Sequence, residues 1–533
     1  MSSLRDSVAT PIFSIYFHTL RHLKLIQIVY RTVYFIRKKI TKKKRLSDKR
    51  TPEYRFLQLN AGIPSKPSFH KETLTFIGIS HKFDNGIDWD FPHHGKLWTY
   101  NLNYFDFLNQ ENFGREDGIA MIHDFIGNLT TLSVGLEPYP TSVRGINWIK
   151  FISKHEIRDQ KIVDSLYSQY DRLMKNIEYH LLGNHLLENA FSLFYAGCFF
   201  NETRFARKAK KILSKELDEQ ILSDGAHFEL SPMYHQIILH RALDCLNVQQ
   251  SVAGSDMELT ETFKSKTAAM IGWLNEATWS DGSIPMVNDT AAGIAPSTKE
   301  LNQYAGLLQL NLSGLRNTTL SDSGYRKVRN GNYEIFIDAG NIGPDYIPGH
   351  AHSDTFSFEM FVGKKPFIVD TGVSTYENNQ RRYLERSTKS HNTVMFNNLE
   401  QTEIWASHRV GRRAKVKILK DTGTELSAQH DGYLRYGVIH IRTFSMQPSK
   451  VIITDCLEGD SEKPAIAYFH FYPGIEPAIR NKEIITSYGK ITFPANAKIA
   501  LKDYHYASGF NNLTKAVVAE ITFNSHLQTT IYC

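Results

Sequence analysis

The stretch Phe356–Val369, FSFEMFVGKKPFIV, decides the fold of the second half of the chain. Apolar residues alternate with polar ones through Phe356–Met360, a turn with glycine and proline follows at 363–366, and a second apolar run covers 367–369. This pattern is typical of a strand, a turn and a second strand. Similar alternation recurs at 333–337, 438–444, 451–454, 466–471 and 483–486. We therefore predict an antiparallel β domain of stacked sheets.

Toward the N-terminus the apolar pattern changes to a helical period. Its clearest example is one stripe formed by Ile162, Leu166, Tyr170, Leu173 and Ile177. Further helices are predicted at 117–133, 143–153, 185–199, 202–222, 233–250 and 260–277. Helix hairpins of similar length favour a toroid or solenoid of paired helices. The predicted fold is multidomain α+β, with helices over 51–320, strands over 321–533, a boundary near 310–325 and a functional cleft between the halves.

The overall composition is that of an ordinary globular protein. Of the 533 residues, 41% are apolar and 22% are charged, which excludes a disordered, collagen-like or multi-span membrane chain. Aromatic residues make up 12% and offer flat surfaces for stacking sugars or bases. Four cysteines lie far apart without CxxC spacing, so we expect buried thiols rather than a disulfide framework.

The net charge of +7 comes from one end of the chain. Residues 1–50 hold 13 of the 62 basic residues and two of the 55 acidic ones, which leaves 49 basic and 53 acidic residues for 51–533. A nucleic-acid-binding domain carries a broad basic surface. We therefore expect no nucleic-acid partner.

Residues 1–50 form a basic amphipathic segment. The longest stretch in it without a charged side chain, Ser7–Leu20, has 14 residues, fewer than the ~20 that span a bilayer. The basic run at 37–45 follows the apolar residues instead of preceding them, so we expect no cleavable secretory signal. Two interpretations stay open: peripheral contact of residues 10–50 with anionic lipid, or a helix packed on the body. The first favours the cell envelope or a membrane-associated location, and the second allows the cytoplasm.

Two polar clusters lie in the helical half. Asn184, His185 and Glu188 open an apolar helix, and Asn184 suits a helix N-cap. Taken alone, this cluster is explained by helix capping. His227, Glu229, Tyr234 and His235 lie around Pro232, which suits the first helical position. That capping role does not explain four chemically active side chains within nine residues.

The β half contains a third cluster, Gly349–Asp354. In an extended chain His350, His352 and Asp354 would point the same way. A His-x-His pair with a nearby acid is a recurrent way to hold a divalent cation, because neutral imidazoles are good nitrogen ligands. Asp370 and His391 supply further ligands. Two histidines and one aspartate together suit a zinc-type site.

These clusters resemble those of the heparinase II/III-like polysaccharide lyases and the related alginate lyases. The similarity runs from about residue 95 to about residue 415. Its motifs are Asn184-His185 with Glu188, Glu229-x-Ser231-Pro232-Met233-Tyr234, Gly349-His350-x-His352-x-Asp354, Asp370-x-Gly372, Arg386-Ser387 with His391-Asn392-Thr393, Glu403-x-Trp405 and Arg409–Arg413. The resemblance implies an incomplete (α/α) toroid followed by an antiparallel β-sandwich domain.

The resemblance also implies roles for individual residues. Asn184 and His185 would neutralise the carboxylate of the substrate, Tyr234 would protonate the leaving oxygen, and His350 would assist as base. A structural zinc would be held by His352, Asp370 and His391. Substrate contacts would come from a set of six residues: Arg144, Asn147, Trp148, Glu188, Glu229 and Arg386.

The resulting hypothesis is a polysaccharide lyase that cleaves a uronate-containing acidic polysaccharide by β-elimination. The near-neutral body favours a bacterial surface or capsular polysaccharide over a heavily sulfated one. One alternative is a glycoside hydrolase, which needs two carboxylates, with Glu188, Glu229 and Asp289 available. Another is a non-catalytic polysaccharide-binding or assembly protein. The choice of Tyr234 or His350 as the base, and the oligomeric state, stay open at this stage.

Overall fold

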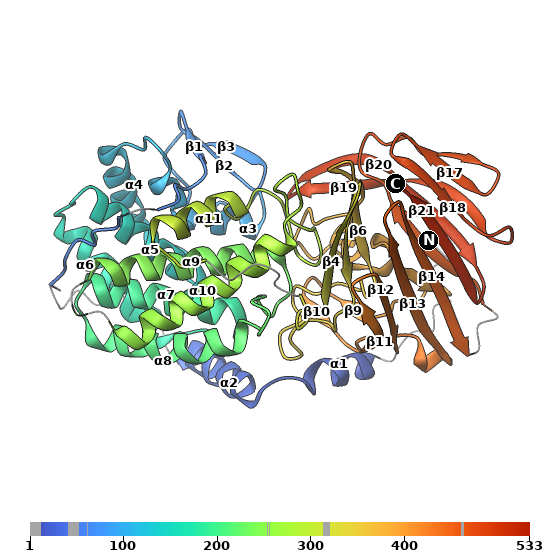
Figure 1. Cartoon of the computed structure of the whole chain (residues 1–533). Helices are drawn as coiled ribbons and strands as arrows, with labels where there is room; N and C mark the ends of the chain where they lie inside the picture. Colours follow the sequence, from blue (N-terminus) through green and yellow to red (C-terminus); the bar gives the residue numbers. More distant parts are fainter. Residues whose placement is uncertain are drawn as a thin grey trace.

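A computed structural model describes residues 12–40, 53–60, 62–252, 254, 256–312, 320–459 and 463–533. A helical half and a β half lie side by side, and two N-terminal helices run along one edge beneath both halves (Figure 1). The order of the elements matches the predicted order of helices followed by strands.

The helical half confirms each helix predicted between residues 117 and 277. Its helices are α3 (Lys96–Tyr104), α4 (Arg115–Asn128), α5 (Pro138–Lys154), α6 (Gln160–Lys175), α7 (Gly183–Phe199), α8 (Thr203–Gln220), α9 (Pro232–Ser251), α10 (Met257–Ala277) and α11 (Thr298–Leu307). The central α7 is almost wholly buried and lies against α5, α8 and α9. Helix α3, helix α11 and a small sheet of β1 (Phe69–His70), β2 (Thr73–Phe76) and β3 (Ile79–Lys82) were not predicted.

The β half is a layered antiparallel sandwich, as predicted. One sheet has the order β11-β12-β13-β14-β21-β18-β17-β16, a second β19-β20-β15-β8 and a third β4-β5-β6-β7. Side chains from all three sheets meet in one apolar core. The strands are β4 (Tyr325–Asn330), β5 (Tyr333–Asp338), β6 (Phe358–Val362), β7 (Lys365–Ile368), β8 (Val394–Phe396), β11 (Val416–Thr422), β12 (Glu425–His430), β13 (Val438–Gln447), β14 (Lys450–Gly459), β15 (Ala465–His470), β16 (Ala478–Arg480), β17 (Glu483–Thr486), β18 (Gly489–Thr492), β19 (Lys498–Gly509), β20 (Asn512–Phe523) and β21 (His526–Tyr532).

The sheet β4–β7 forms the boundary between the two cores. Ile335 and Ile337 of β5 face the core of the sandwich, whereas Phe336 packs with the helical core. Phe361 of β6 stacks on Trp279 with ring centroids 4.2 Å apart. A strand covered on both faces is apolar at nearly every position, which explains why all six residues of β5 are buried.

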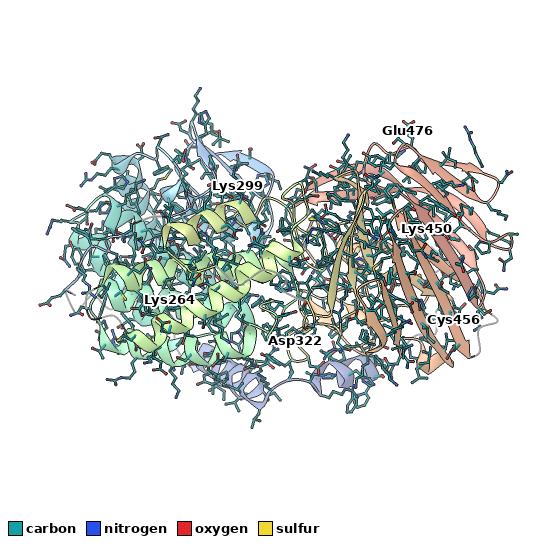
Figure 2. All side chains as sticks on the ribbon, viewed as in Figure 1. Lys264, Lys299, Asp322, Lys450, Cys456 and Glu476 are labelled. Carbon is teal, nitrogen blue, oxygen red and sulfur yellow. The ribbon has the colours of Figure 1, made fainter. Side chains whose placement is uncertain are left out.

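The predicted boundary near 310–325 falls between α11 and β4, and its residues 313–319 lie outside the described ones. Asp322, at the far end of this connection, lies between the two halves (Figure 2) and accepts a hydrogen bond from Ser223. Next to it, Asp224 accepts hydrogen bonds from the amide and hydroxyl of Ser323, at 2.8 and 2.7 Å. These contacts fix the β half against the loop that precedes α9.

The N-terminal segment forms two helices, α1 (Ile12–Leu20) and α2 (Leu25–Ile40), and both pack on the body. The hydroxyl of Thr19 on α1 donates to the carbonyl of Val410 and accepts from the indole N–H of Trp405. On α2, Tyr34 donates to the carbonyl of Ile177 in the helical half. The basic run at 42–45 lies outside the described residues. Within the described part of the chain, no helix has the length and apolar character needed to cross a bilayer.

Candidate active site at the domain interface

The start of α7 presents Asn184 to the β half. The helix begins at Gly183, and Leu182 at the N-cap gives no side-chain cap. Asn184 therefore does not act as a cap, contrary to the capping interpretation. Its backbone N–H and its side-chain amide both donate to Glu229, at 2.9 and 2.8 Å. Gly183 has φ +57°, and a Cβ there would lie 2.5 Å from Glu229 Oε1, so this turn requires glycine.

The start of α9 presents Tyr234. The hydroxyl of Ser231 caps the helix by accepting from the Tyr234 N–H, and Pro232 occupies the first turn. The Tyr234 ring stacks over His350 with centroids 4.0 Å apart, and its hydroxyl lies 3.3 Å from that of Tyr376. Burial, reinforced by Tyr376, raises the pKa of Tyr234 well above its ordinary value. Tyr234 therefore keeps its proton at neutral pH.

Asp289 joins the helical half to the His-x-His motif. Residues 349–357 form no strand, yet His350 Nδ1 and His352 Nε2 lie 2.9 and 2.8 Å from the two oxygens of Asp289. Arg382 donates to the same oxygens at 2.5 and 2.7 Å. Burial alone would raise the pKa of Asp289, but Arg382 and the two imidazoles hold it well below the usual range. With Asp289 ionised, Nδ1 of His350 carries a proton and donates to it, which in a neutral ring leaves Nε2 as the acceptor.

His185 is the more exposed of the two predicted carboxylate partners, since 35% of its side chain is accessible. Its Nδ1 lies 3.3 Å from Glu178 Oε1, and its ring lies 4.7 Å from that of Tyr139. Burial lowers the pKa of His185, but the carboxylate of Glu178 outweighs this effect and the net shift is upward. Glu178 therefore favours the protonated form of His185, and part of the imidazole faces solvent.

Three of the four residues predicted to be catalytic, Asn184, Tyr234 and His350, come together at the domain interface, whereas the His185 side chain contacts Glu178 and Tyr139. Glu229 holds Asn184 by two hydrogen bonds, and its Oε2 lies 3.5 Å from His350 Nε2. The ring of Tyr234 lies tilted against the imidazole of His350. His185 follows Asn184 directly on α7. The arrangement places an imidazole and a protonated phenol side by side next to a buried carboxylate, a set suited to moving a proton beside an anionic group.

The block predicted to line the cleft is instead part of the helical core. Arg144 is fully buried and donates to Gln169 and to the carbonyls of Asn103 and Gly135. Trp148 is fully buried among aromatic rings, and Asn147 donates to the carbonyl of Tyr104. The structure thus places Arg144, Asn147 and Trp148 in the core and not on an exposed surface, and their contact with substrate stays a prediction.

Three further predicted substrate contacts are also buried. Glu188 pairs with Arg241 at 2.9 Å, inside the helical half. Arg386 donates to the carbonyls of Ala351 and Ala406 and so holds the loop that carries His350. Glu229 is bonded to Asn184 as described above. In this structure all three side chains are buried and hold other groups in place, and their contact with substrate stays a prediction.

The predicted zinc ligands lie behind the catalytic group. His352 and His391 are buried with ring centroids 5.3 Å apart, and His391 Nδ1 lies 2.7 Å from Asp370 Oδ2. His352 Nδ1, His391 Nε2 and Asp354 Oδ2 have no hydrogen-bond partner among the described residues. Unpaired buried nitrogen and oxygen atoms fit a metal-binding set. The ligand atoms of His352, Asp370 and His391 nevertheless do not all lie within 4.8 Å of one another.

Among the described residues, one triplet does meet that spacing: Asp289, His350 and His408. Arg382 already occupies both oxygens of Asp289 and lies 3.5 Å from His408 Nδ1. A guanidinium at this distance repels a divalent cation. We therefore interpret this triplet as an ion-pair network and not as a metal site.

Several residues of the site were missed by sequence reasoning. Asp289 was considered as a hydrolase carboxylate, whereas Arg382, Tyr376, His408 and Glu178 were not singled out. Asp289 and Arg382 are 93 residues apart, and no local pattern links them. The one available signal for Arg382 was its position close to Arg386, in the helix α12 (Gln380–Arg386).

The sequence matches two parts of one family. Residues 142–310 match "Heparinase II/III N-terminus", and residues 314–532 match "Heparinase II/III-like, C-terminal". The chain belongs to the heparinase II/III-like family. Two curated relatives are heparin-sulfate lyases, from Bacteroides stercoris (26% identical over 263 residues) and Pedobacter heparinus (24% over 264 residues). These alignments cover 42% and 45% of this chain, but only 37% and 39% of the relatives.

Solved structures share the fold over a longer range. Heparinase III matches with a TM-score of 0.69 at 18% identity, over 85% of this chain and 80% of that structure. Chondroitin AC lyase from Streptomyces coelicolor matches with a TM-score of 0.55 at 9% identity, over 83% and 75%. At this identity the similarity concerns the fold alone, and it confirms the predicted helical toroid followed by a β-sandwich.

Proposed function

We propose that this chain is a polysaccharide lyase that cleaves a uronate-containing acidic polysaccharide by β-elimination. The observation that carries the proposal is a group of contacts between the two halves. Asn184 and His350 both lie against the carboxylate of Glu229, and the ring of Tyr234 lies against that of His350. The names of the curated relatives, heparin-sulfate lyases, support the same class of reaction. The low charge of residues 51–533 favours a bacterial surface or capsular polysaccharide as substrate.

The first requirement of the reaction is to stabilise negative charge. Removing the C5 proton of a uronate places additional charge on its carboxylate, so hydrogen-bond donors aimed at that group lower the barrier. His185, which is partly exposed and whose pKa is raised by Glu178, is the main donor in this proposal. Asn184 is nearly buried and uses its amide on Glu229, so it contributes mainly by orienting the start of α7.

The second requirement is a base and an acid. In the proposed step His350 Nε2 takes the C5 proton, the electrons of that bond form the C4–C5 double bond, and the C4–oxygen bond breaks. Tyr234, whose pKa is raised by burial, gives its proton to the leaving oxygen. Asp289 keeps His350 in the tautomer with a free Nε2. If the C5 proton lies on the opposite face of the sugar, Tyr234 serves both steps: it first gives its own proton to His350, then takes the C5 proton, and finally passes that proton to the leaving oxygen.

A glycoside hydrolase is disfavoured by the state of the available carboxylates. Hydrolysis needs two carboxyl groups that flank the scissile bond. Glu188 is paired with Arg241, Glu229 with Asn184, and Asp289 with Arg382 and two histidines. All three are buried. None of them is therefore placed to protonate a glycosidic oxygen.

We also propose a structural zinc, bound by His352, Asp370 and His391, that fixes the loop carrying His350. Support comes from the unpaired Nδ1 of His352 and Nε2 of His391, and zinc binding by Asp370 would require it to leave Nδ1 of His391. His391→Ala is expected to abolish zinc in the purified protein, as measured by elemental analysis, and to lower its melting temperature. His470→Ala is the matched control, because His470 is equally buried but bonds to Asn392, and it should keep its zinc. Zinc retained by folded His391→Ala would contradict the proposal.

The function is tested by screening uronate-containing polysaccharides for ultraviolet absorbance from unsaturated ends. On a substrate that responds, Tyr234→Phe and His350→Ala are expected to lose at least ~100-fold in kcat, the usual contribution of general acid–base groups. Tyr383→Phe is the control, since Tyr383 is exposed on α12, and it should match the parent. If the parent and all three variants bind the polysaccharide and the parent does not cleave it, the result would instead support a non-catalytic binding protein.

A further inference from the structure

The two N-terminal helices carry their apolar residues on the outside. On α1 the exposed positions are Phe13, Tyr16, Phe17 and Leu20, and on α2 they include Leu25, Ile28, Val29, Phe35 and Ile36. Within each helix these positions follow a helical period and form one face. Phe13, Leu25 and Phe35 are 81%, 75% and 61% exposed. Nine of the nineteen large apolar side chains that are exposed in the described residues therefore lie within 24 residues of each other.

The opposite face of the same two helices packs on the protein through polar groups together with a few apolar side chains, among them Ile26 and Tyr30. Ser14 and His18 of α1 accept hydrogen bonds from Arg412 of the β half. On α2, Gln27 is buried and donates to two backbone carbonyls of the body. A helix that packs on a globular protein normally turns its most apolar face toward the protein and its charged face toward solvent. The outward apolar face is thus left without a partner in the single chain.

The surroundings of this face are cationic. Arg21, Arg37 and Lys39 are exposed on or beside the two helices, and the sequence has no Asp or Glu from residue 7 to residue 47. A cavity of about 390 Å³ opens between α2 and the helical half. Its walls combine aromatic and cationic side chains and include no carboxylate: Tyr30, Tyr34, Arg37, Met174, Lys175, Ile177, Tyr179 and Lys208.

We propose that α1 and α2 dock this protein on an anionic lipid bilayer. The apolar face enters the interfacial region of the bilayer, and the cavity lined by Arg37, Lys175 and Lys208 takes the phosphate of a lipid headgroup. Apolar burial and attraction of basic residues to anionic lipid act together in such helices, at about 1 kcal/mol per Lys or Arg near the surface. The segment 7–47 itself carries no acidic residue, and the nearby Glu219 and Asp345 are paired with Lys24 and Arg413. The remaining positive charge favours lipid over a second copy of the chain, whose corresponding face has the same charge.

The test is co-sedimentation of the full chain with vesicles. Vesicles of phosphatidylcholine with 30% phosphatidylglycerol, by design about one anionic lipid in three, should bind the protein, and pure phosphatidylcholine should bind at least ~10-fold less. Raising the salt concentration should weaken the binding. A variant with Phe13→Ser, Phe17→Ser, Leu25→Ser and Phe35→Ser should lose binding at least ~10-fold, and Lys208→Gln should reduce the preference for anionic vesicles.

The matched control replaces four exposed apolar residues elsewhere: Met257→Ser, Leu307→Ser, Leu434→Ser and Leu513→Ser. It removes a similar apolar area and should bind vesicles like the parent. The proposal is overturned if the parent does not bind anionic vesicles, if it binds both vesicle types equally, or if the two variants behave alike. It is also overturned if light scattering detects a dimer in the absence of lipid and if the α1/α2 variant abolishes this dimer while the control variant keeps it. The apolar face of α1 and α2 would then bind a second copy of the chain. Binding to vesicles is independent of the proposed lyase activity.

Discussion

Asp289 is the residue on which the candidate site depends most. Four groups converge on its carboxylate: two from the histidine motif and two from the guanidinium of Arg382. The aspartate and the arginine are both fully buried. Buried charges are tolerated when they are paired and hydrogen-bonded, and removing one partner leaves the other without compensation. Asp289 therefore sets both the stability of the interface and the tautomer of His350.

Replacing Arg382 should show this dependence. Arg382→Met keeps the volume of the side chain but leaves Asp289 buried without its cation, at a cost of about 3–5 kcal/mol. The melting temperature, followed by calorimetry, should fall by about 3–5 °C. Arg480→Met is the control, because Arg480 is exposed on β16, and its melting temperature should stay within about 2 °C of the parent. Equal melting temperatures for the two variants would show that the pair contributes nothing.

Sequence reasoning identified a residue of the site only where a reactive side chain belongs to a recognisable motif and the fold also places it at the interface. Tyr234 and His350 carry reactive groups in motifs that the sequence displays, and both lie at the interface. Arg144 and Trp148 show the limit of this reasoning, because a polar or aromatic residue beside a helix start fits a cleft and a core equally well. Their burial depends on α5 lying between α3 and α7, which is a property of the tertiary structure.

At the scale of elements, the helical and strand patterns predicted most of the secondary structure. The stripe from Ile162 to Leu173 lies in α6, and the alternating run at 438–444 lies in β13. The small sheet β1–β3 was missed because its strands have only two to four residues. The N-terminal segment was read as one helix, yet it breaks at 21–24 into two helices that pack on different halves.

Strands β13 and β14 contain a second buried ion pair with a measurable pH signature. Arg442 lies opposite Asp455 in the strand register and donates to it at 2.7 Å, and His440 also bonds to it. Burial raises the pKa of Asp455, but Arg442 and His440 lower it by more than burial raises it, and the resulting pKa is about 2. Because the folded-state pKa lies below the unfolded one, this stabilisation is present above about pH 4 and is lost as pH falls toward 2.

Asp455→Asn should therefore destabilise the β half by about 2 kcal/mol at pH 7. The difference in melting temperature between parent and variant should shrink as pH falls from 4 to 2, because the parent loses the charge that the variant lacks. Asp503→Asn, at an exposed position on β19, should show no such trend. A gap that stays constant down to pH 2 would mean that Asp455 is not held ionised by Arg442.

Helix α2 also connects the two catalytic segments. Gln27 Nε2 donates to the carbonyls of Leu181 and Tyr346, at 3.3 and 3.2 Å. Leu181 lies three residues before Asn184, and Tyr346 lies four residues before His350. One buried amide thus joins the segment that carries Asn184 to the loop that carries His350. Gln27 is a positioning residue, since it does not belong to the site itself.

Gln27→Ala should lower kcat by about 10-fold or more on a responsive substrate, because small displacements of catalytic groups cost large factors in rate. The effect on KM should be smaller, which distinguishes displacement of the catalytic groups from lost substrate binding. Thr32→Ala is the control, as Thr32 is exposed on the same helix and bonds only to the Ile28 carbonyl. Unchanged kcat in folded Gln27→Ala would show that the connection has no catalytic role.

At the scale of the whole molecule, the sheet β4–β7 fixes the relation of the two halves. Its two faces are buried in different cores, so the helical and β halves share a packed wall. The sequence predicted two halves with a cleft between them but did not indicate this shared sheet. A strand that is buried on both faces has an apolar sequence, whichever cores cover its two faces. The wall explains how Asp289 and Glu229 from one half reach His350 from the other.

The central claim is that this interface performs an elimination on a uronate. The most direct test is mass spectrometry of the products formed from a responsive polysaccharide, together with their ultraviolet absorbance. The account predicts that each cut yields a new unsaturated end and that the products together weigh the same as the substrate. Products that together gain one water per cut, without the absorbance, would contradict it.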